Sequence, residues 1–140
     1  IVLEIGVNMN SRRILILDDE DMIRMLLRRL LEKKGFEIVE ASSAEEALEI
    51  LKNDFIQIMF FDLMLPGMNG IELCKLVKKQ HPIAIIYAMT GYTSVFELAS
   101  TREAGFDDYF LKPLKLDIIL KAAEDAVEKL SRWMRLKPSN

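Results

Sequence analysis

The chain has 140 residues, of which 51% are hydrophobic and 29% are charged, and its formal net charge is -3. This length suits one domain with a proper core, and the composition excludes an intrinsically disordered or fibrous protein. Charges of both signs are interspersed along the chain, so we expect no nucleic-acid-binding surface within it.

Two further features concern the compartment in which the protein works. Its single cysteine, Cys74, cannot form an internal disulfide, which is typical of a reducing cytoplasm. No apolar stretch approaches the roughly 20 residues that cross a bilayer, so we expect a cytoplasmic protein without a membrane contact. The opening residues 1–5 lack the basic flank and the length of a signal peptide, and residues 1–11 are treated as an extension of unclear origin, outside the fold.

The first half of the chain alternates short apolar runs with amphipathic segments. Residues 14–17 and 36–41 are predicted strands, and residues 21–34 are a predicted helix that Gly35 ends as a C-terminal cap. Ser42 or Ser43, with an acidic residue three positions later, starts the next predicted helix. A third strand covers the apolar run at 55–61 and ends at Asp62.

The same alternation continues through the second half. We expect helices at 71–80, 94–104 and 116–135, and strands at 83–89 and 108–111. Leu26 and Leu76 are among the positions expected to face inward from their helices. Because each strand is followed by a helix, the strands must pair in parallel through right-handed crossovers. The predicted fold is an α/β doubly wound sheet of five strands with five helices, a three-layer sandwich.

Polar residues stand where four of these strands end. Asp18 and Asp19 follow the first strand, Asp62 ends the third, Thr90 follows the fourth and Lys112 follows the fifth. All strands of a parallel sheet point the same way, so these side chains should converge on one edge of the sheet, where open α/β sheets bind their ligands.

Three carboxylates gathered at one edge require a balancing positive charge. At an effective dielectric constant of about 20, two like charges about 4 Å apart repel by about 4 kcal/mol. Hard oxygen ligands of this kind suit Mg²⁺, and Lys112 adds a further cation. A carboxylate neutralised in this way is suited to act as a nucleophile in phosphoryl transfer.

In their order and spacing these residues resemble the receiver domain of bacterial response regulators in two-component signalling. The resemblance covers residues 12–130 and rests on residues 14–20 (ILILDDE), 61–70 (FDLMLPGMNG), 89–91 (MTG) and 109–114 (YFLKPL). It implies a flavodoxin-like sheet with the strand order 2-1-3-4-5. Residues 131–140 would then be the extended end of the last helix and a tail.

The resemblance also implies a role for each site residue. Asp62 would accept a phosphoryl group from the phosphohistidine of a sensor histidine kinase or a phosphotransfer protein. Asp19, Asp62 and the backbone carbonyl of Met64 would bind Mg²⁺, with Asp18 acting mainly through water. Lys112 would pair with the phosphoryl group, and its peptide bond to the following proline is expected to be cis.

A switch and a set of partners follow from the same resemblance. Thr90 would donate its hydroxyl to the phosphoryl group, and Tyr109 would turn into the space that this movement opens. The affected surface is the fourth helix, fifth strand and fifth helix, which would contact a downstream protein or an attached output domain. The protein would be a signalling domain that promotes its own phosphorylation and dephosphorylation, not a turnover enzyme.

Two alternatives from other functional classes stay open. A haloacid dehalogenase-like phosphatase or phosphotransferase also carries two aspartates two residues apart after a strand, as Asp19 and Asp21 are here. A scaffold pseudo-receiver would bind proteins without being phosphorylated, although the complete acidic, threonine and lysine set argues against it.

Three smaller features of the sequence complete the expectations. Met64 and Tyr92, two residues after Asp62 and Thr90, are bulky and cannot orient an attacking water, which predicts slow self-dephosphorylation. An apolar stripe along the last helix, ending near Trp133, predicts either a homodimer or a connection to a following domain. The alternative is a frayed helix end whose basic residues, Arg132, Arg135 and Lys137, complement the helix dipole. Cys74 is expected to be a buried apolar residue.

Overall fold

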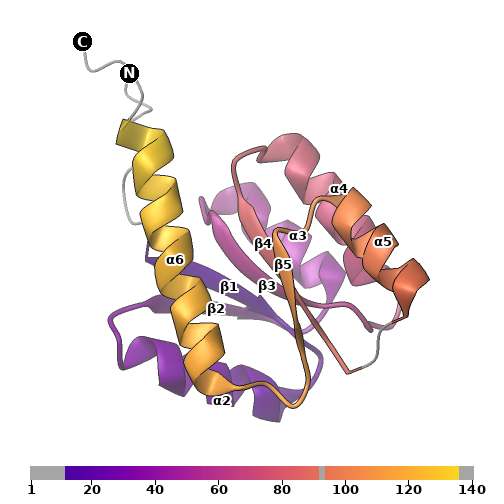
Figure 1. Cartoon of the computed structure of the whole chain (residues 1–140), viewed down its shortest axis with the longest axis horizontal. Coiled ribbons are helices and arrows are strands. Elements are labelled where there is room, and N and C mark those ends of the chain that lie inside the picture. Colours follow the sequence, from indigo (N-terminus) through magenta and orange to yellow (C-terminus); the bar gives the residue numbers. More distant parts are fainter. Residues whose placement is uncertain (1–11, 92–93, 136–140) are drawn as a thin grey trace.

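A single parallel sheet forms the middle layer of the fold in the computed structural model, which describes residues 12–91 and 94–135 (Figure 1). The strands lie in the order β2-β1-β3-β4-β5, and every neighbouring pair is parallel. They are β1 (Arg13–Leu17), β2 (Glu37–Ala41), β3 (Ile58–Asp62), β4 (Ile85–Thr90) and β5 (Asp108–Leu111). The predicted fold class and strand order are therefore confirmed.

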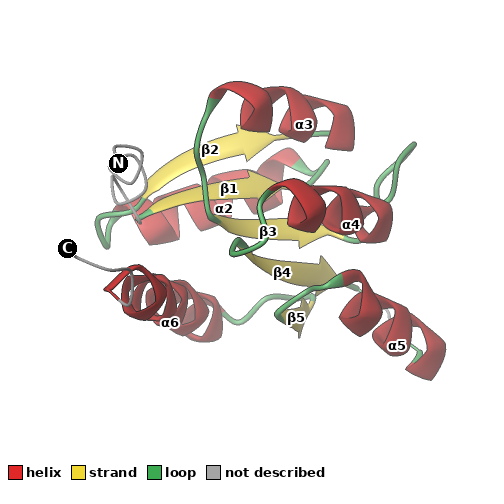
Figure 2. Ribbon diagram, turned by 90° about the horizontal axis from the view of Figure 1, so that it is seen from above, coloured by secondary structure: helices red, strands yellow, loops and turns green. Residues whose placement is uncertain are grey.

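Helices cover both faces of the sheet, as Figure 2 shows from above. They are α2 (Asp21–Glu32), α3 (Ala44–Asn53), α4 (Gly70–Gln80), α5 (Val95–Ala104) and α6 (Leu116–Arg135). One apolar core joins the sheet to α2 and α6, and a second lies on the opposite face under α3 and α4. None of the described helices is long and apolar enough to cross a membrane.

The ends of the helices follow the chemistry that the sequence predicts. The side chain of Ser43 accepts a hydrogen bond from the Glu46 backbone at the start of α3. After α2, Gly35 has φ +89°, and the Phe36 N–H bonds to the Leu31 carbonyl, which is a Schellman closure. These two caps set the start of α3 and the end of α2.

Two strands begin two or more residues later than predicted. The third strand starts at Ile58 rather than residue 55, and the fourth at Ile85 rather than residue 83. Pairing of β3 with β1 begins at Ile14 opposite Ile58, so the preceding apolar residues have no strand beside them. Phe55 and Ile83, which precede the paired segments of β3 and β4, are 41% and 44% exposed, whereas Ile56 is buried in the core.

Two helical positions predicted to face inward are exposed instead. Leu26 is 42% and Leu76 is 38% exposed, whereas Leu27 and Val77, one position further along, are buried. Each residue advances a helix by about 100°. A predicted apolar face that includes one residue too many at its edge therefore extends to the solvent side of the helix.

The long last helix packs on its own sheet for most of its length. Its apolar stripe from Ile119 to Leu130 is buried in the core shared with α2. Trp133 lies beyond that contact and is 58% exposed. The stripe is therefore largely accounted for by the chain's own core, and a homodimer along it stays a prediction.

Candidate functional site

The carboxyl edge of the sheet brings the predicted site residues together. Asp18 directly follows β1, Asp62 and Thr90 are the last residues of β3 and β4, and Lys112 directly follows β5. The strand register places these ends side by side, with Asp62 opposite Met89 and Thr90 opposite Leu111. Parallel topology is thus the reason why residues far apart in sequence meet here.

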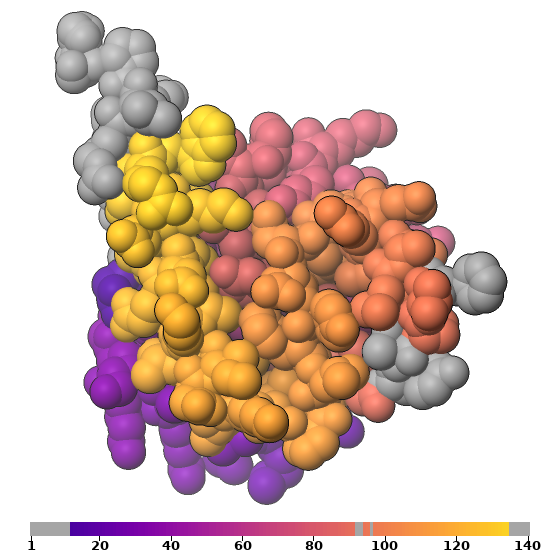
Figure 3. Space-filling model, in the orientation of Figure 1, coloured from indigo at the N-terminus to yellow at the C-terminus, as the bar shows by residue number. Residues whose placement is uncertain are grey.

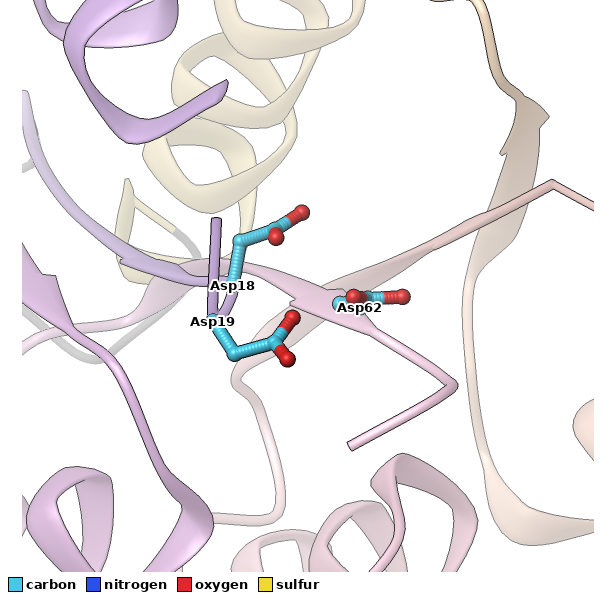
Figure 4. A group of neighbouring side chains, drawn as sticks. All are labelled: Asp18, Asp19 and Asp62. Atoms are coloured by element: carbon cyan, nitrogen blue, oxygen red, sulfur yellow. The ribbon is translucent and has the colours of Figure 1, made fainter. Parts of the chain in front are cut away.

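Three carboxylates form the centre of this site (Figure 4). Asp18, Asp19 and Asp62 each offer one oxygen, and these oxygens all lie within 4.8 Å of one another. Asp18 and Asp62 are buried, whereas Asp19 is exposed. The cluster is therefore open to solvent on one side and desolvated on the other.

Lys112 supplies a cation at the buried side of the cluster. Its Nζ lies 2.9 Å from Oδ2 of Asp18 and 3.5 Å from Oδ2 of Asp62. Burial opposes the charged form of Lys112, but the hydrogen bond to Asp18 and the two negative charges outweigh it, so the pKa of the ammonium is raised. The peptide between Lys112 and Pro113 is cis, as the resemblance to receiver domains implies.

The environment of Asp62 favours a bound cation. Burial raises the pKa of Asp62 and the negative charge of Asp18 adds to the rise, while the Met64 N–H and Lys112 act in the opposite direction. The cluster thus holds more negative charge than Lys112 alone balances. Carboxylate oxygens with an open side are the donor set that suits Mg²⁺, so the residues present fit that ion.

The loop after β3 is shaped by a hydrogen bond to the Asp62 side chain and by the close approach of Gly70 to the Asp62 backbone. The Met64 N–H donates to Oδ1 of Asp62 over 3.1 Å, which fixes one carboxylate oxygen. A Cβ on Gly70 would lie 2.7 Å from the carbonyl oxygen of Asp62, closer than such atoms approach one another. Glycine is therefore required for α4 to start this close to the end of β3. The Met64 side chain is 64% exposed, and its carbonyl as a metal ligand stays a prediction.

The two residues of the predicted switch lie on neighbouring strands. Thr90 is buried, and its carbonyl accepts a hydrogen bond from the Lys112 N–H over 2.8 Å. Tyr109 is 36% exposed and lines a hollow with Leu98 and Arg102 of α5. The tyrosine therefore points toward the surface in this structure. Tyr92, predicted to flank the site, lies outside the described residues.

One contact at the site was not predicted from the sequence. Arg24 of α2 donates through Nη1 to the backbone carbonyl of Asp18 over 2.7 Å. It also pairs with Asp21, which is therefore engaged with a helix residue and lies outside the three-carboxylate cluster. This removes the structural support for a dehalogenase-like pair of Asp19 and Asp21. An arginine on the polar face of a helix is common, so the sequence alone does not predict that Arg24 bonds to the Asp18 carbonyl.

Comparison with protein families gives a match over most of the chain. The family model described as response regulator receiver domain matches residues 14–124. Among curated proteins, the chain is 43% identical over 105 residues to the transcriptional regulatory protein SrrA of Staphylococcus aureus, covering 74% of this chain and 42% of that protein. The chain spans less than half the length of the first curated relatives it matches.

Solved structures give the same picture. A response regulator receiver domain protein (CheY-like) from Methanospirillum hungatei JF-1 is 31% identical, with a TM-score of 0.84 over 88% of this chain and 98% of that one. The beryllofluoride-activated NtrC4 receiver domain dimer is 25% identical, with a TM-score of 0.80 over 85% of this chain and 98% of that one. Both likenesses extend over nearly the whole of the solved chains.

Proposed function

Because the chain belongs to the response regulator receiver domain family of two-component signalling, we propose that Asp62 accepts a phosphoryl group from a sensor histidine kinase or a phosphotransfer protein. The observation that carries the proposal is the buried Asp62 carboxylate with the Lys112 ammonium 3.5 Å away and two more carboxylates beside it. A carboxylate oxygen attacks phosphorus, the P–N bond of the phosphohistidine breaks, and its electron pair returns to the imidazole.

The other site residues support this transfer in distinct ways. Lys112 pairs with Asp62 and balances the charge that the phosphoryl oxygens bring. Thr90, at the end of the neighbouring strand, donates its hydroxyl to one of those oxygens. Asp19, Asp62 and the Met64 carbonyl would hold Mg²⁺ directly, and Asp18 would hold it through water. When bound, the ion neutralises the oxygens of the phosphoryl group during transfer.

Phosphorylation is proposed to act on the surface built from α5, β5 and α6. These are the fourth helix, the fifth strand and the fifth helix of the described chain. Figure 3 shows this surface, with the residues of β5 between the yellow α6 and the deeper orange α5. Thr90 moves toward the phosphoryl group, and Tyr109 turns inward from its exposed position. Because the two orientations exist in equilibrium, phosphorylation shifts their populations and changes the surface that a partner contacts.

The same surface is the proposed contact with an output partner. SrrA is named a transcriptional regulatory protein, and this chain matches less than half of its length. The output is therefore an attached domain or a separate downstream protein. A second copy of this chain is a further proposed partner, because the NtrC4 receiver domain forms a dimer in its solved structure. With a net charge of -3, this chain is not proposed to bind nucleic acid itself. The cytoplasmic location and the domain limits at residues 12 and 130 stay predictions.

Mass spectrometry after incubation with acetyl phosphate and Mg²⁺ tests the proposal. We expect the intact mass to rise by one phosphoryl group, and the label to map to Asp62 and to be absent from Asp62→Asn. A label on Asp19 would support the dehalogenase-like alternative instead. A chain that neither takes up the label nor binds beryllofluoride with Mg²⁺ would be a scaffold pseudo-receiver.

A further inference from the structure

The side chain of Asp19 depends on its backbone for its placement at the site. Within the described part of the chain this side chain makes no hydrogen bond or ion pair, unlike Asp18 and Asp62, which both contact Lys112. The loop that carries it is short, because β1 ends at Leu17 and α2 begins at Asp21. Whatever fixes the peptide between Asp18 and Asp19 therefore fixes the position from which the Asp19 side chain reaches the site.

The side chain at the N-cap of α2 does not fix this loop. Glu20 occupies the N-cap of α2 but makes no side-chain cap hydrogen bond. Oδ1 of Asp18 accepts from the Glu20 N–H over 2.9 Å, and the Asp18 N–H donates to the Ala41 carbonyl over 3.2 Å. The first contact closes a turn from the Asp18 side chain across the peptide between Asp18 and Asp19, and the second ties the Asp18 backbone to the end of β2, but neither supplies a donor to the Asp18 carbonyl. The carbonyl of the peptide between Asp18 and Asp19 needs a donor of its own.

Arg24 is that donor. Its Nη1 donates to the Asp18 carbonyl over 2.7 Å, its Nε donates to Oε1 of Glu40 on β2 over 2.9 Å, and its Nη2 pairs with Asp21. The guanidinium is rigid and planar, so three bonds to a loop, a strand and a helix lock it in one orientation. Its side chain is only 14% exposed, which limits competition from water.

We infer that Arg24 is a positioning residue for the divalent cation, acting through the peptide between Asp18 and Asp19. This inference rests on the proposed function, because Asp19 is a proposed ligand of Mg²⁺. The positive charge of Arg24 is matched by Asp21 and Glu40, so it does not replace the cation at the carboxylates. Its contribution is to hold the backbone from which the Asp19 carboxylate reaches the ion, as residues that orient metal ligands do.

Arg28 provides a matched control on the same helix. It pairs with the same Glu40 and with Glu32, and it donates to the Ile38 carbonyl, but it makes no hydrogen bond to the loop at residues 18–20. Arg24→Gln and Arg28→Gln therefore both remove an ion pair between α2 and β2. Only Arg24→Gln removes the donor to the Asp18 carbonyl.

The experiment measures Mg²⁺ binding and stability separately in the 140-residue chain. Titration calorimetry gives the dissociation constant for Mg²⁺, and urea unfolding in EDTA gives the free energy of unfolding without metal. We expect Arg24→Gln to weaken Mg²⁺ binding roughly tenfold, as loss of a residue that orients a metal ligand does, and Arg28→Gln to leave it unchanged. Both variants should lose stability in EDTA. Phosphorylation of Arg24→Gln should need more Mg²⁺ but reach the wild-type rate at saturation.

Arg24→Lys keeps the charge and serves if the glutamine variant does not fold. A lysine presents a single point donor, so it cannot bond to the Asp18 carbonyl and Glu40 in the same fork, and we expect weakened Mg²⁺ binding here too. Wild-type Mg²⁺ affinity in a folded Arg24 variant would overturn the inference, as would equal weakening in Arg28→Gln. If the wild-type chain binds no Mg²⁺, the proposed metal site itself is wrong and the role of Arg24 falls with it.

Discussion

The Nζ of Lys112 lies 2.9 Å from Oδ2 of Asp18, although 94 positions separate the two residues in sequence. Asp18 is fully buried, and the side chain of Lys112 is 19% exposed. Lys112→Met would leave the Asp18 carboxylate buried without this cation, so we expect the free energy of unfolding in EDTA to fall by about 3 kcal/mol. Mg²⁺ should then stabilise the variant more than the wild type, because the ion supplies the missing positive charge.

Urea unfolding with and without Mg²⁺ measures both effects. Lys115→Met is the control, since Lys115 is an exposed lysine three residues further along that makes no ion pair in the described part of the chain. If the two variants lose the same stability, the bond between Lys112 and Asp18 contributes nothing specific to the fold.

The convergence of Asp18, Asp62 and Lys112 could be predicted because it follows from topology. Once strands and helices alternate, the sheet must be parallel, and every strand end lies at the same edge. The sequence needs only to show where each strand stops, and each of these strands stops at a polar residue after an apolar run. The order of strands and helices therefore predicts both the fold and which polar residues lie together at the edge of the sheet.

Other features depend on neighbours that the sequence does not reveal. The strand starts at Ile58 and Ile85 coincide with the first residue pairs between neighbouring strands, and the apolar runs that precede them do not reveal those pairs. The contact from Arg24 to the Asp18 carbonyl depends on how α2 crosses the end of β1. The outward orientation of Tyr109 depends on the space beside α5, which packing determines.

Asp19→Asn should raise the stability of the metal-free protein and lower its response to Mg²⁺. The substitution removes one of three carboxylates whose oxygens lie within 4.8 Å of one another. Because Asp19 is exposed, we expect a gain of only about 0.5 kcal/mol in EDTA. The increase in melting temperature on adding Mg²⁺ should disappear, since a proposed ligand is lost.

A thermal shift series over Mg²⁺ concentration checks this expectation. Glu20→Gln is the control, because it removes a negative charge from the next residue of the same loop, outside the three-carboxylate cluster. A less stable Asp19→Asn protein in EDTA would show that repulsion among the carboxylates is not what limits the metal-free state.

Glu40 on β2 should give stability that disappears in acid. Burial of Glu40 acts to raise its pKa, but the hydrogen bonds from Arg28 and Arg24 outweigh it, so the pKa is lowered in the folded protein. A carboxylate with a lowered pKa stabilises the fold above the unfolded value of about 4.3 and loses that contribution as the pH falls below it. At pH 7 we expect Glu40→Gln to cost about 2 kcal/mol.

The pH dependence of this difference is the measurement. Urea unfolding of the wild type and Glu40→Gln should differ most above pH of about 5 and converge as the pH falls below about 4. Glu49→Gln, which alters an exposed residue of α3, should change stability little. A difference between wild type and Glu40→Gln that stays constant down to acid pH would mean that the charge of Glu40 is not what stabilises the contact between α2 and β2.

Gly70→Ala should displace the end of β3. The added Cβ would lie 2.7 Å from the Asp62 carbonyl oxygen and 3.0 Å from the Cα of Leu63, so backbone atoms must move. We expect a loss of about 2 kcal/mol, typical of overpacking, together with slower phosphorylation by acetyl phosphate. Gly91→Ala is the control beside Thr90, because its Cβ would meet nothing within 4 Å. Equal stability in the two variants would show that α4 can move away from Asp62 at no cost.

Met64→Asn should speed the loss of the phosphoryl group from Asp62. Met64 follows the phosphoacceptor by two positions, and its 64% exposed side chain offers no group that can orient an attacking water. An amide at this position can hydrogen-bond to that water, and a bond that contributes about 1.4 kcal/mol in the transition state gives about a tenfold faster decay. Phosphorylated protein freed of donor would be followed by intact mass over time, with Met64→Leu, which keeps the bulk and stays apolar, decaying like the wild type. Equal decay of Met64→Asn and wild type would show that this side chain does not limit hydrolysis.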